Sequence, residues 1–213
     1  MITWSGISHF GDITITAFTA LAIAGWLVVE GEKRLALWWS LLFAGGLGIV
    51  IATKMAFIGW GIGIRTLDFT GFSGHAMRAM AVLPVLLYLI LERAPRAVRI
   101  TGTALGFAFG ALVGVSRVAV HAHSVSEAVT GMALGAVVSI CFLRIAGSSL
   151  RKHVFSPLRI VLSMVALLQA PYVHPAPTQQ WLTSLTLYFS GREEPFPRAG
   201  WKEHRPQHEA PAS

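Results

Sequence analysis

The sequence predicts an all-α fold, a polytopic membrane bundle of about six transmembrane helices. Apolar residues make up 54% of the 213 residues and charged residues only 13%, with a mean hydropathy of +0.62. A soluble domain normally carries about a quarter charged residues, so most of this surface does not face water. The apolar runs approach the roughly 20 residues that a helix needs to cross a bilayer, which disfavours a β-barrel.

The first two predicted spans, 10–29 and 35–51, are separated by a charged turn at 30–34. Asp12 is expected to cap the first helix, where a negative charge is favourable; a catalytic role for it is the weaker alternative. The second span contains small residues that let helices approach closely, and Lys54 is expected at its end. Residues 55–72 are too broken by glycine for a span, and we expect a re-entrant or interfacial segment that lines a cavity.

The remaining predicted spans are 76–91, 100–115, 128–143 and a weaker one at 157–170. After Pro171 the composition changes to prolines and polar residues. Residues 1–171 are therefore predicted as the transmembrane domain. Residues 172–213 are predicted as an interfacial segment, with the run 181–189 along the membrane surface and a disordered tail.

The charge of +7 does not indicate nucleic-acid binding, because basic residues in a membrane protein usually mark cytoplasmic loops. With alternating connections, one side holds basic residues in or beside short loops, which predicts that this side is cytoplasmic. The site residues discussed below then all fall on the outer side. We expect an integral protein of a bacterial inner membrane, with its site facing the periplasm or the outside. Cys141 is the single cysteine, so no intrachain disulfide can form.

A polar cluster at 116–127 lies between two apolar runs. Polar groups near a bilayer are costly, and such a cluster indicates a functional site. If the chain is helical from about Ser124, His123 and Glu127 lie four residues apart on one face, where the carboxylate can fix the tautomer of the imidazole. Arg117 could provide a cation for an oxyanion. The cluster therefore predicts a site for attack on a phosphate.

Ser73, Gly74 and His75 stand directly before the third span, where free backbone N–H groups make a natural anion site. Taken alone, a Ser-Gly-His at a helix start is usually a cap, and a His–Glu pair is often only a helix-stabilising contact. The convergence of these loops on one side of the membrane favours a single site.

These residues resemble the type 2 phosphatidic acid phosphatase (PAP2) superfamily. Its pattern is a Lys…Arg-Pro segment, then Pro-Ser-Gly-His, then Ser-Arg-x5-His-x3-Asp. Here Ser116, Arg117, His123 and Glu127 reproduce the third motif with Glu for Asp, and Phe72 replaces the proline of the second. Lys54 stands for the first motif's lysine, but Arg65 follows eleven residues later instead of seven and is not followed by proline.

The resemblance implies metal-independent dephosphorylation through a phosphohistidine, without metal or other cofactor. It implies His123 as nucleophile, Glu127 as the carboxylate that orients it, and His75 as the acid for the leaving group. The remaining implied residues form a phosphate cradle: Lys54, Ser73, the Gly74 amide, Arg117 and Arg65. Arg78 could replace Arg65 or have a structural role, and His121 has no assigned role.

We expect the substrates to be membrane lipid phosphates or pyrophosphates, such as phosphatidic acid, phosphatidylglycerol phosphate or an isoprenoid diphosphate. One alternative is a lipid phosphotransferase that uses the same phosphohistidine. Another is a non-catalytic lipid-binding or transport protein that retains the cradle. The sequence predicts no particular oligomeric state.

Overall fold

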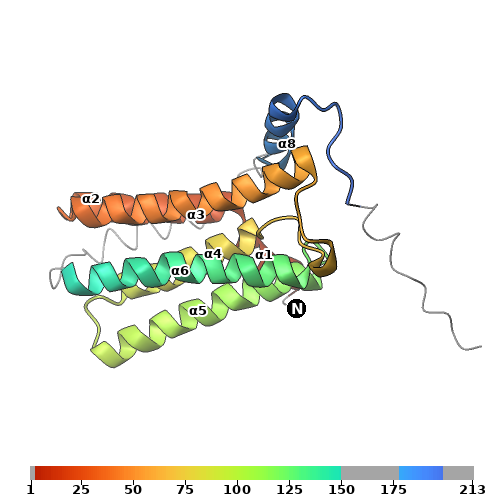
Figure 1. The fold of residues 1–213 in the computed structure, drawn as a ribbon. Helices are drawn as coiled ribbons and strands as arrows, with labels where there is room; N and C mark the ends of the chain where they lie inside the picture. The colour runs from red at the N-terminus through yellow and green to blue at the C-terminus, as the bar shows by residue number, and fades with distance from the viewer. Residues whose placement is uncertain (1–2, 150–177, 199–213) are drawn as a thin grey trace, which may run out of the picture.

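A computed structural model describes residues 3–149 and 178–198 of the chain, and within them it is helical and contains no strand. Figure 1 shows the elements in order. They are α1 (Trp4–His9), α2 (Ile13–Val29), α3 (Lys33–Trp60), the short 3₁₀ helix η1 (Arg65–Leu67), α4 (Gly74–Ile90), α5 (Arg96–Ala119), α6 (Val125–Ser149) and α8 (Thr178–Ser190).

The described helices agree with the predicted membrane bundle. By length and composition α3, α5 and α6 can cross a membrane, and α2 and α4 are apolar helices of 17 residues each. Five of the six predicted spans thus correspond to observed helices. The sixth, at 157–170, and the predicted domain boundary at 171 lie outside the described residues.

One boundary prediction was wrong. Helix α3 continues to Trp60, well beyond the predicted end at Ile51, so Lys54 lies inside a helix and not at its end. Residues 52–58 contain no glycine or proline that would interrupt a helix. The helix ends at Gly61, which has a φ of 68° and therefore the left-handed conformation that glycine adopts without steric cost.

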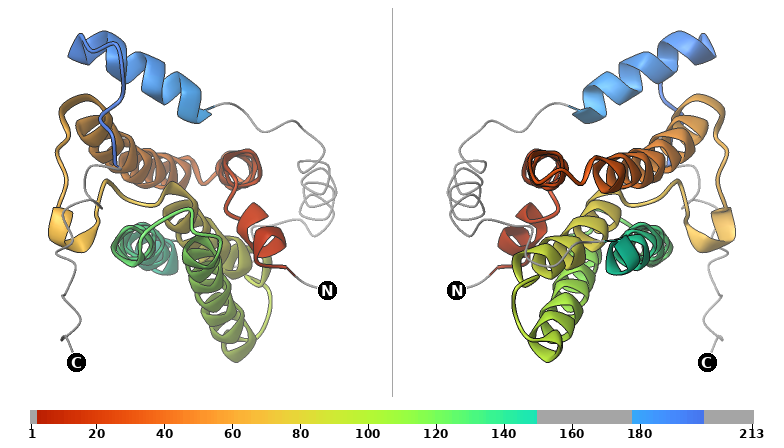
Figure 2. Two further views of the ribbon diagram at one scale, coloured as in Figure 1. Left: turned by 90° about the vertical axis from the view of Figure 1, so that its right-hand side faces the viewer. Right: turned by 90° about the vertical axis from the view of Figure 1, so that its left-hand side faces the viewer.

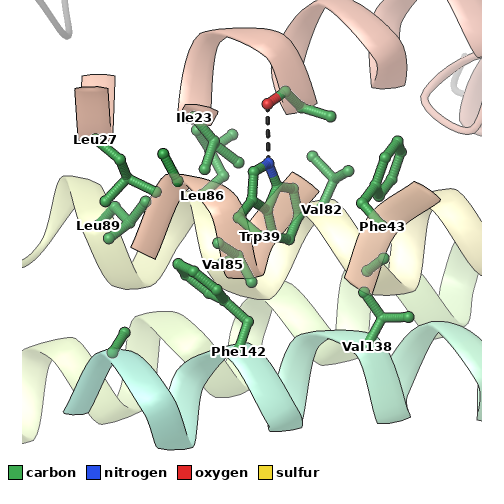
Figure 3. Packing of buried hydrophobic residues seen from close by; sticks show 14 of the residues in the cluster. Ile23, Leu27, Trp39, Phe43, Val82, Val85, Leu86, Leu89, Val138 and Phe142 are labelled. Carbon is green, nitrogen blue, oxygen red and sulfur yellow. Dashed lines mark hydrogen bonds between the residues drawn. The ribbon is translucent and has the colours of Figure 1, made fainter. Parts of the chain in front are cut away.

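Helix α4 is the centre of the bundle. Twelve of its 17 residues are buried, and it packs against α2, α3, α5 and α6. Figure 3 shows the core that joins four of these helices, with Trp39 of α3 in its middle. The Trp39 indole N–H donates to the carbonyl of Ala20 at 2.9 Å, which satisfies a polar atom that would otherwise be buried without a partner.

Glycines let α5 and α6 approach the backbone of α4. On α5 they recur every four residues, at Gly102, Gly106 and Gly110. A Cβ atom at Gly106 would lie 2.7 Å from the Cα of Pro84, and one at Gly131 of α6 would lie 2.6 Å from the carbonyl oxygen of Ser73. Small residues of this kind allow close helix contact in membranes. Here they also bring the first turns of α4 and α6 together.

The polar loops gather at one end of the bundle. At that end lie the C-termini of α3 and α5 and the N-termini of α4 and α6 (Figure 1). The charged turns α2–α3 and α4–α5 lie at the opposite end (Figure 1). Helix α8 packs on α3 and runs across the bundle axis at the first end (Figure 2). Which side of the membrane each end faces stays a prediction.

Candidate active site

His123 and Glu127 form the contact expected from their spacing. The turn after α5 includes His121 at a φ of 56°, and α6 begins at Val125, which places Glu127 in its first turn. The His123 Nδ1 atom lies 2.8 Å from Glu127 Oε2. An ionised carboxylate can only accept a hydrogen bond, so Nδ1 carries a proton. In the neutral form of the ring the contact therefore fixes the tautomer that leaves the lone pair on Nε2, as a nucleophile requires.

The Glu127 carboxylate is buried, with 1% of its surface exposed, and donors surround it. The backbone N–H of Thr70 donates to Oε1 at 3.0 Å, and the Thr70 hydroxyl donates to the same oxygen. The Ser124 N–H donates to Oε2 at 3.2 Å, and Arg198 Nη1 lies 3.4 Å from Oε1. A buried charge is tolerated only when it is paired and hydrogen-bonded. The contacts fit an ionised Glu127. Its Oε1 is held by Thr70 and lies near Arg198, and its Oε2 contacts His123 and the Ser124 N–H.

The loop between α3 and α4 is tied to the start of α6. The Ser73 N–H donates to the Glu127 carbonyl at 3.0 Å, and the Ser126 hydroxyl donates to the Leu67 carbonyl at 2.7 Å. The Phe72 N–H donates to the Thr53 hydroxyl of α3 at 3.3 Å. Backbone and side-chain bonds thus hold the second and third motifs together.

A cavity of about 460 Å³ opens beside the His–Glu pair. It brings together five of the predicted site residues: Lys54, His75, Arg117, His123 and Glu127. Among its other lining residues are Thr70, Gly71, Gln179 and Arg198. Gly71 has a φ of 142°, a conformation that residues with a side chain rarely adopt, and a Cβ there would lie 3.2 Å from the backbone nitrogen of Lys54. Three cations (Lys54, Arg117 and Arg198) and two imidazoles line one cavity that is large enough for a phosphate group.

Three predicted cradle residues, Ser73, Gly74 and Arg65, do not line this cavity. Ser73 is buried, and its hydroxyl accepts from the Ala76 N–H at 3.5 Å as the N-cap of α4. Gly74 packs closely against Arg78 and Val50. The capping role of Ser73 is thus observed, whereas phosphate binding by Ser73 and Gly74 stays a prediction.

Arg65 and Arg78, the two alternatives for a further phosphate-binding arginine, differ in their position relative to the cavity. Arg65 is exposed on η1 and is not among the residues that line the cavity. Arg78 is buried and donates from Nε to the Thr16 hydroxyl and from Nη2 to the Gly11 carbonyl, both at 3.0 Å. Its Nη2 also lies 3.5 Å from His75 Nδ1. This geometry favours a structural role for Arg78, and it does not support Arg65 as a phosphate ligand.

A second, smaller cavity of about 170 Å³ is also lined by Arg117 and His75. It is lined by Ser5, Ser8, His9, Asp12, His75, Arg117 and Val120. Asp12 accepts from the Thr14 N–H at 2.8 Å as the N-cap of α2, which confirms the predicted cap. Arg117 donates to the Ser8 hydroxyl, so α1, which the sequence did not predict, holds one end of its guanidinium.

Sequence reasoning missed Thr70 and Arg198. Arg198 forms an ion pair with Asp68 at 3.0 Å and reaches Glu127 from the C-terminal segment. Burial disfavours its charge, but the hydrogen bonds to Asp68 and the charges of Glu127 and Asp68 raise the pKa of Arg198 above its ordinary value. The displacement of Arg65 from the superfamily pattern is the feature of the sequence that points to a cation from another part of the chain.

Comparison with known proteins assigns the chain to a family. The PAP2 superfamily matches residues 53–151, which include all three motifs. A second match is 37% identical over 206 residues and covers 92% of this chain and 96% of its own length. The chain belongs to the PAP2 superfamily.

That relative of this PAP2 protein is named as an uncharacterized 22.5 kDa protein in the cps region of Klebsiella pneumoniae. No solved structure matches the chain. Membership supports a function of the phosphatase or phosphotransferase type, and together with the apolar helices it indicates a membrane protein. The superfamily match ends before α8 and Arg198.

Among the described residues, no group of three or more His, Cys, Asp and Glu side chains lies together as a set of metal ligands.

Proposed function

We propose that this protein is a membrane phosphatase that hydrolyses lipid phosphates or pyrophosphates through a phosphohistidine, without a metal ion. The observation that carries the proposal is the 2.8 Å contact between His123 Nδ1 and a buried Glu127 on a cavity that Lys54 and Arg117 also line. Phosphoryl transfer asks little of a protein beyond positioning and stabilisation of charge on the equatorial oxygens. The contact between His123 and Glu127 supports the positioning of the nucleophile, and Lys54 and Arg117 support the stabilisation of charge.

In the first step, His123 Nε2 attacks phosphorus while the bond from phosphorus to the leaving oxygen breaks. Glu127 holds the ring by Nδ1 and stabilises the positive charge that develops on the imidazole. Lys54 and Arg117 bind the phosphoryl oxygens, whose charge increases in the transition state. Fixed donors of this kind can be the largest contribution to the rate.

His75 gives the leaving oxygen its proton. In the second step it takes a proton from the water that attacks phosphorus, and the bond from phosphorus to nitrogen breaks. Arg78 Nη2 lies 3.5 Å from His75 Nδ1. A guanidinium only donates, so Nδ1 accepts from it in the empty site. To act as the acid, the ring must take a second proton on Nδ1 from solvent, which requires the contact with Arg78 to open. The negative charge of a bound substrate favours this proton, because it compensates the surrounding cations.

Helix α8 supports a lipid as the substrate. Four large apolar side chains project from one face of it, at helical spacing, and all are exposed: Trp181 (63%), Leu185 (49%), Tyr188 (82%) and Phe189 (63%). A helix of this kind, with Trp and Tyr on its apolar face, is typical of the membrane interface. Gln179 of the same helix lines the cavity. The site would then open at the depth of lipid headgroups, with the acyl or isoprenoid chain in the bilayer.

The test is a phosphate-release screen on purified protein in detergent, across phosphatidic acid, phosphatidylglycerol phosphate and an isoprenoid diphosphate. Wild type should release phosphate from at least one of them, and His123→Ala should lose at least about 1000-fold of the rate, as expected when a nucleophile is removed. Phosphate transferred to a second lipid, detected by mass spectrometry, would instead indicate a phosphotransferase. Binding of lipid phosphate without any turnover would indicate a non-catalytic binding protein.

A further inference from the structure

The C-terminal segment after α8 returns to the cavity and brings a cation to it. Phe196 anchors this segment on the end of α3: its N–H donates to the Ile58 carbonyl at 2.9 Å, and its ring meets that of Phe57 with centroids 5.9 Å apart. Gly61, at the end of α3, leaves the space that the Phe196 ring fills, because a Cβ there would lie 2.7 Å from that ring. Two residues later, Arg198 lines the cavity.

Asp68 orients the Arg198 guanidinium by one edge. Nε lies 3.2 Å from Asp68 Oδ1, and Nη2 lies 3.0 Å from Oδ2 and 3.2 Å from the Asp68 carbonyl. A guanidinium has five N–H donors in a fixed fork, so this bidentate pair leaves Nη1 directed elsewhere. The Arg198 side chain keeps a third of its surface exposed.

Nη1 is held near Glu127 but is not fully used by it. The separation from Oε1 is 3.4 Å, whereas a charge-assisted N–H···O bond is typically about 2.7–2.9 Å. Oε1 already accepts two hydrogen bonds from Thr70. The donors on Nη1 are thus available to an oxygen of a group that enters the cavity.

We propose that Arg198 is a phosphate-binding residue, which supplies from the C-terminal segment the cation that the displaced Arg65 does not bring to the cavity. Asp68 positions it, and Phe196 fixes the segment that carries it. With Lys54 and Arg117 it makes a third positive charge on the lining, which suits a group that is at least doubly negative: a phosphate monoester or a diphosphate. The proposal rests on the proposed function for its substrate, but binding of phosphate can be tested by itself.

The experiment compares full-length wild type with Arg198→Gln and Arg198→Lys, with Arg144→Gln as the matched control. Arg144 is exposed on α6, towards the end of the helix remote from the site. Its variant removes the same charge as Arg198→Gln but changes no residue of the cavity. Two readouts are taken: kcat and KM for the lipid phosphate that wild type hydrolyses, and stabilisation of the detergent-solubilised protein against heat by inorganic phosphate and vanadate.

Arg198→Gln should raise KM and weaken binding of both anions by about tenfold, an effect between that of an exposed ion pair and that of a buried hydrogen bond to a charged group. Its kcat should stay within about threefold, because Glu127 keeps its bonds to Thr70, Ser124 and His123. The KM and the anion affinities of Arg198→Lys should lie between those of wild type and Arg198→Gln, since lysine keeps the charge but not the forked guanidinium. Arg144→Gln should match wild type in both readouts.

Unchanged KM and anion binding in Arg198→Gln would overturn the proposal. So would a fall in kcat alone, which would mean that Arg198 acts only through Glu127, and so would a wild type that neither anion stabilises. A wild type that binds the anions in an Arg198-dependent way but hydrolyses no lipid phosphate would contradict the proposed function while supporting this inference.

Discussion

Replacing Glu127 by glutamine should separate the charge of this residue from its size. The amide keeps one acceptor oxygen and puts an NH₂ group, which cannot accept, in the place of the other. If the NH₂ group replaces Oε1, the Thr70 hydroxyl can rotate to accept from it, but the buried Thr70 N–H loses its partner and the partly exposed Arg198 loses its contact with Oε1. If it replaces Oε2, His123 can accept through Nδ1, and only the Ser124 N–H loses its partner.

Either arrangement leaves one buried donor without a partner, which costs about 1–3 kcal/mol of unfolding free energy. The second arrangement also moves the imidazole proton to Nε2, the nitrogen that must attack. Where such a change reverses the tautomer of a catalytic histidine, the rate falls by about 10⁴; loss of an outer partner alone costs about 10–100-fold. For Glu127→Gln we therefore expect a rate lower by about 10²–10⁴, with modest destabilisation.

The assay is the initial rate of phosphate release, with thermal unfolding in the same detergent as the control for folding. Glu127→Asp keeps the charge and should retain much of the activity, although the shorter side chain must move the His123 ring or the helix. Glu127→Ala should lose most of it. Equal rates in all three variants and wild type would refute the role given to Glu127 and the tautomer argument with it.

Two further outcomes can be checked. Gly131→Ala should lower the midpoint of thermal unfolding and the rate together, because its Cβ would lie 2.6 Å from the Ser73 carbonyl and push α6 from the start of α4. Gly45→Ala in α3, where nothing lies within 4 Å of a Cβ, is the matched control and should keep both values. Chelation with EDTA should leave the rate of phosphate release unchanged, and abolition of activity by EDTA would contradict the metal-independent mechanism.

The bundle could be predicted from the sequence because long apolar runs with helix-breaking turns have few other interpretations. The end of α3 could not, since hydropathy falls near Lys54 although the helix continues to Trp60. A lysine beside an apolar run lowers the mean hydropathy of the residues around it. The sequence therefore indicates the end of a helix at this position, although the helix continues. The short α1 was missed for a similar reason: six residues are too few to give a periodic signal.

The parts of the site that are local in sequence could be predicted. The contact of His123 with Glu127 follows from helical spacing, and Ser73 is the cap that its position suggested. Thr70 and Arg198 depend on the paths of a loop and of a C-terminal segment, and no spacing rule connects them to residue 127. The exposed position of Arg65 likewise follows from the fold of that loop.

The bond from the Phe72 N–H to the Thr53 hydroxyl bears on how the superfamily pattern can vary. Proline, which the pattern has at position 72, stiffens the chain by its ring but has no N–H to donate. In this protein the hydrogen bond to Thr53 of the neighbouring helix α3 restrains the chain at position 72 instead. Thr53 directly precedes Lys54, which lines the cavity. Positions 53 and 72 should therefore change in concert among relatives: a hydroxyl at 53 is dispensable wherever 72 is proline, and valuable wherever it is not.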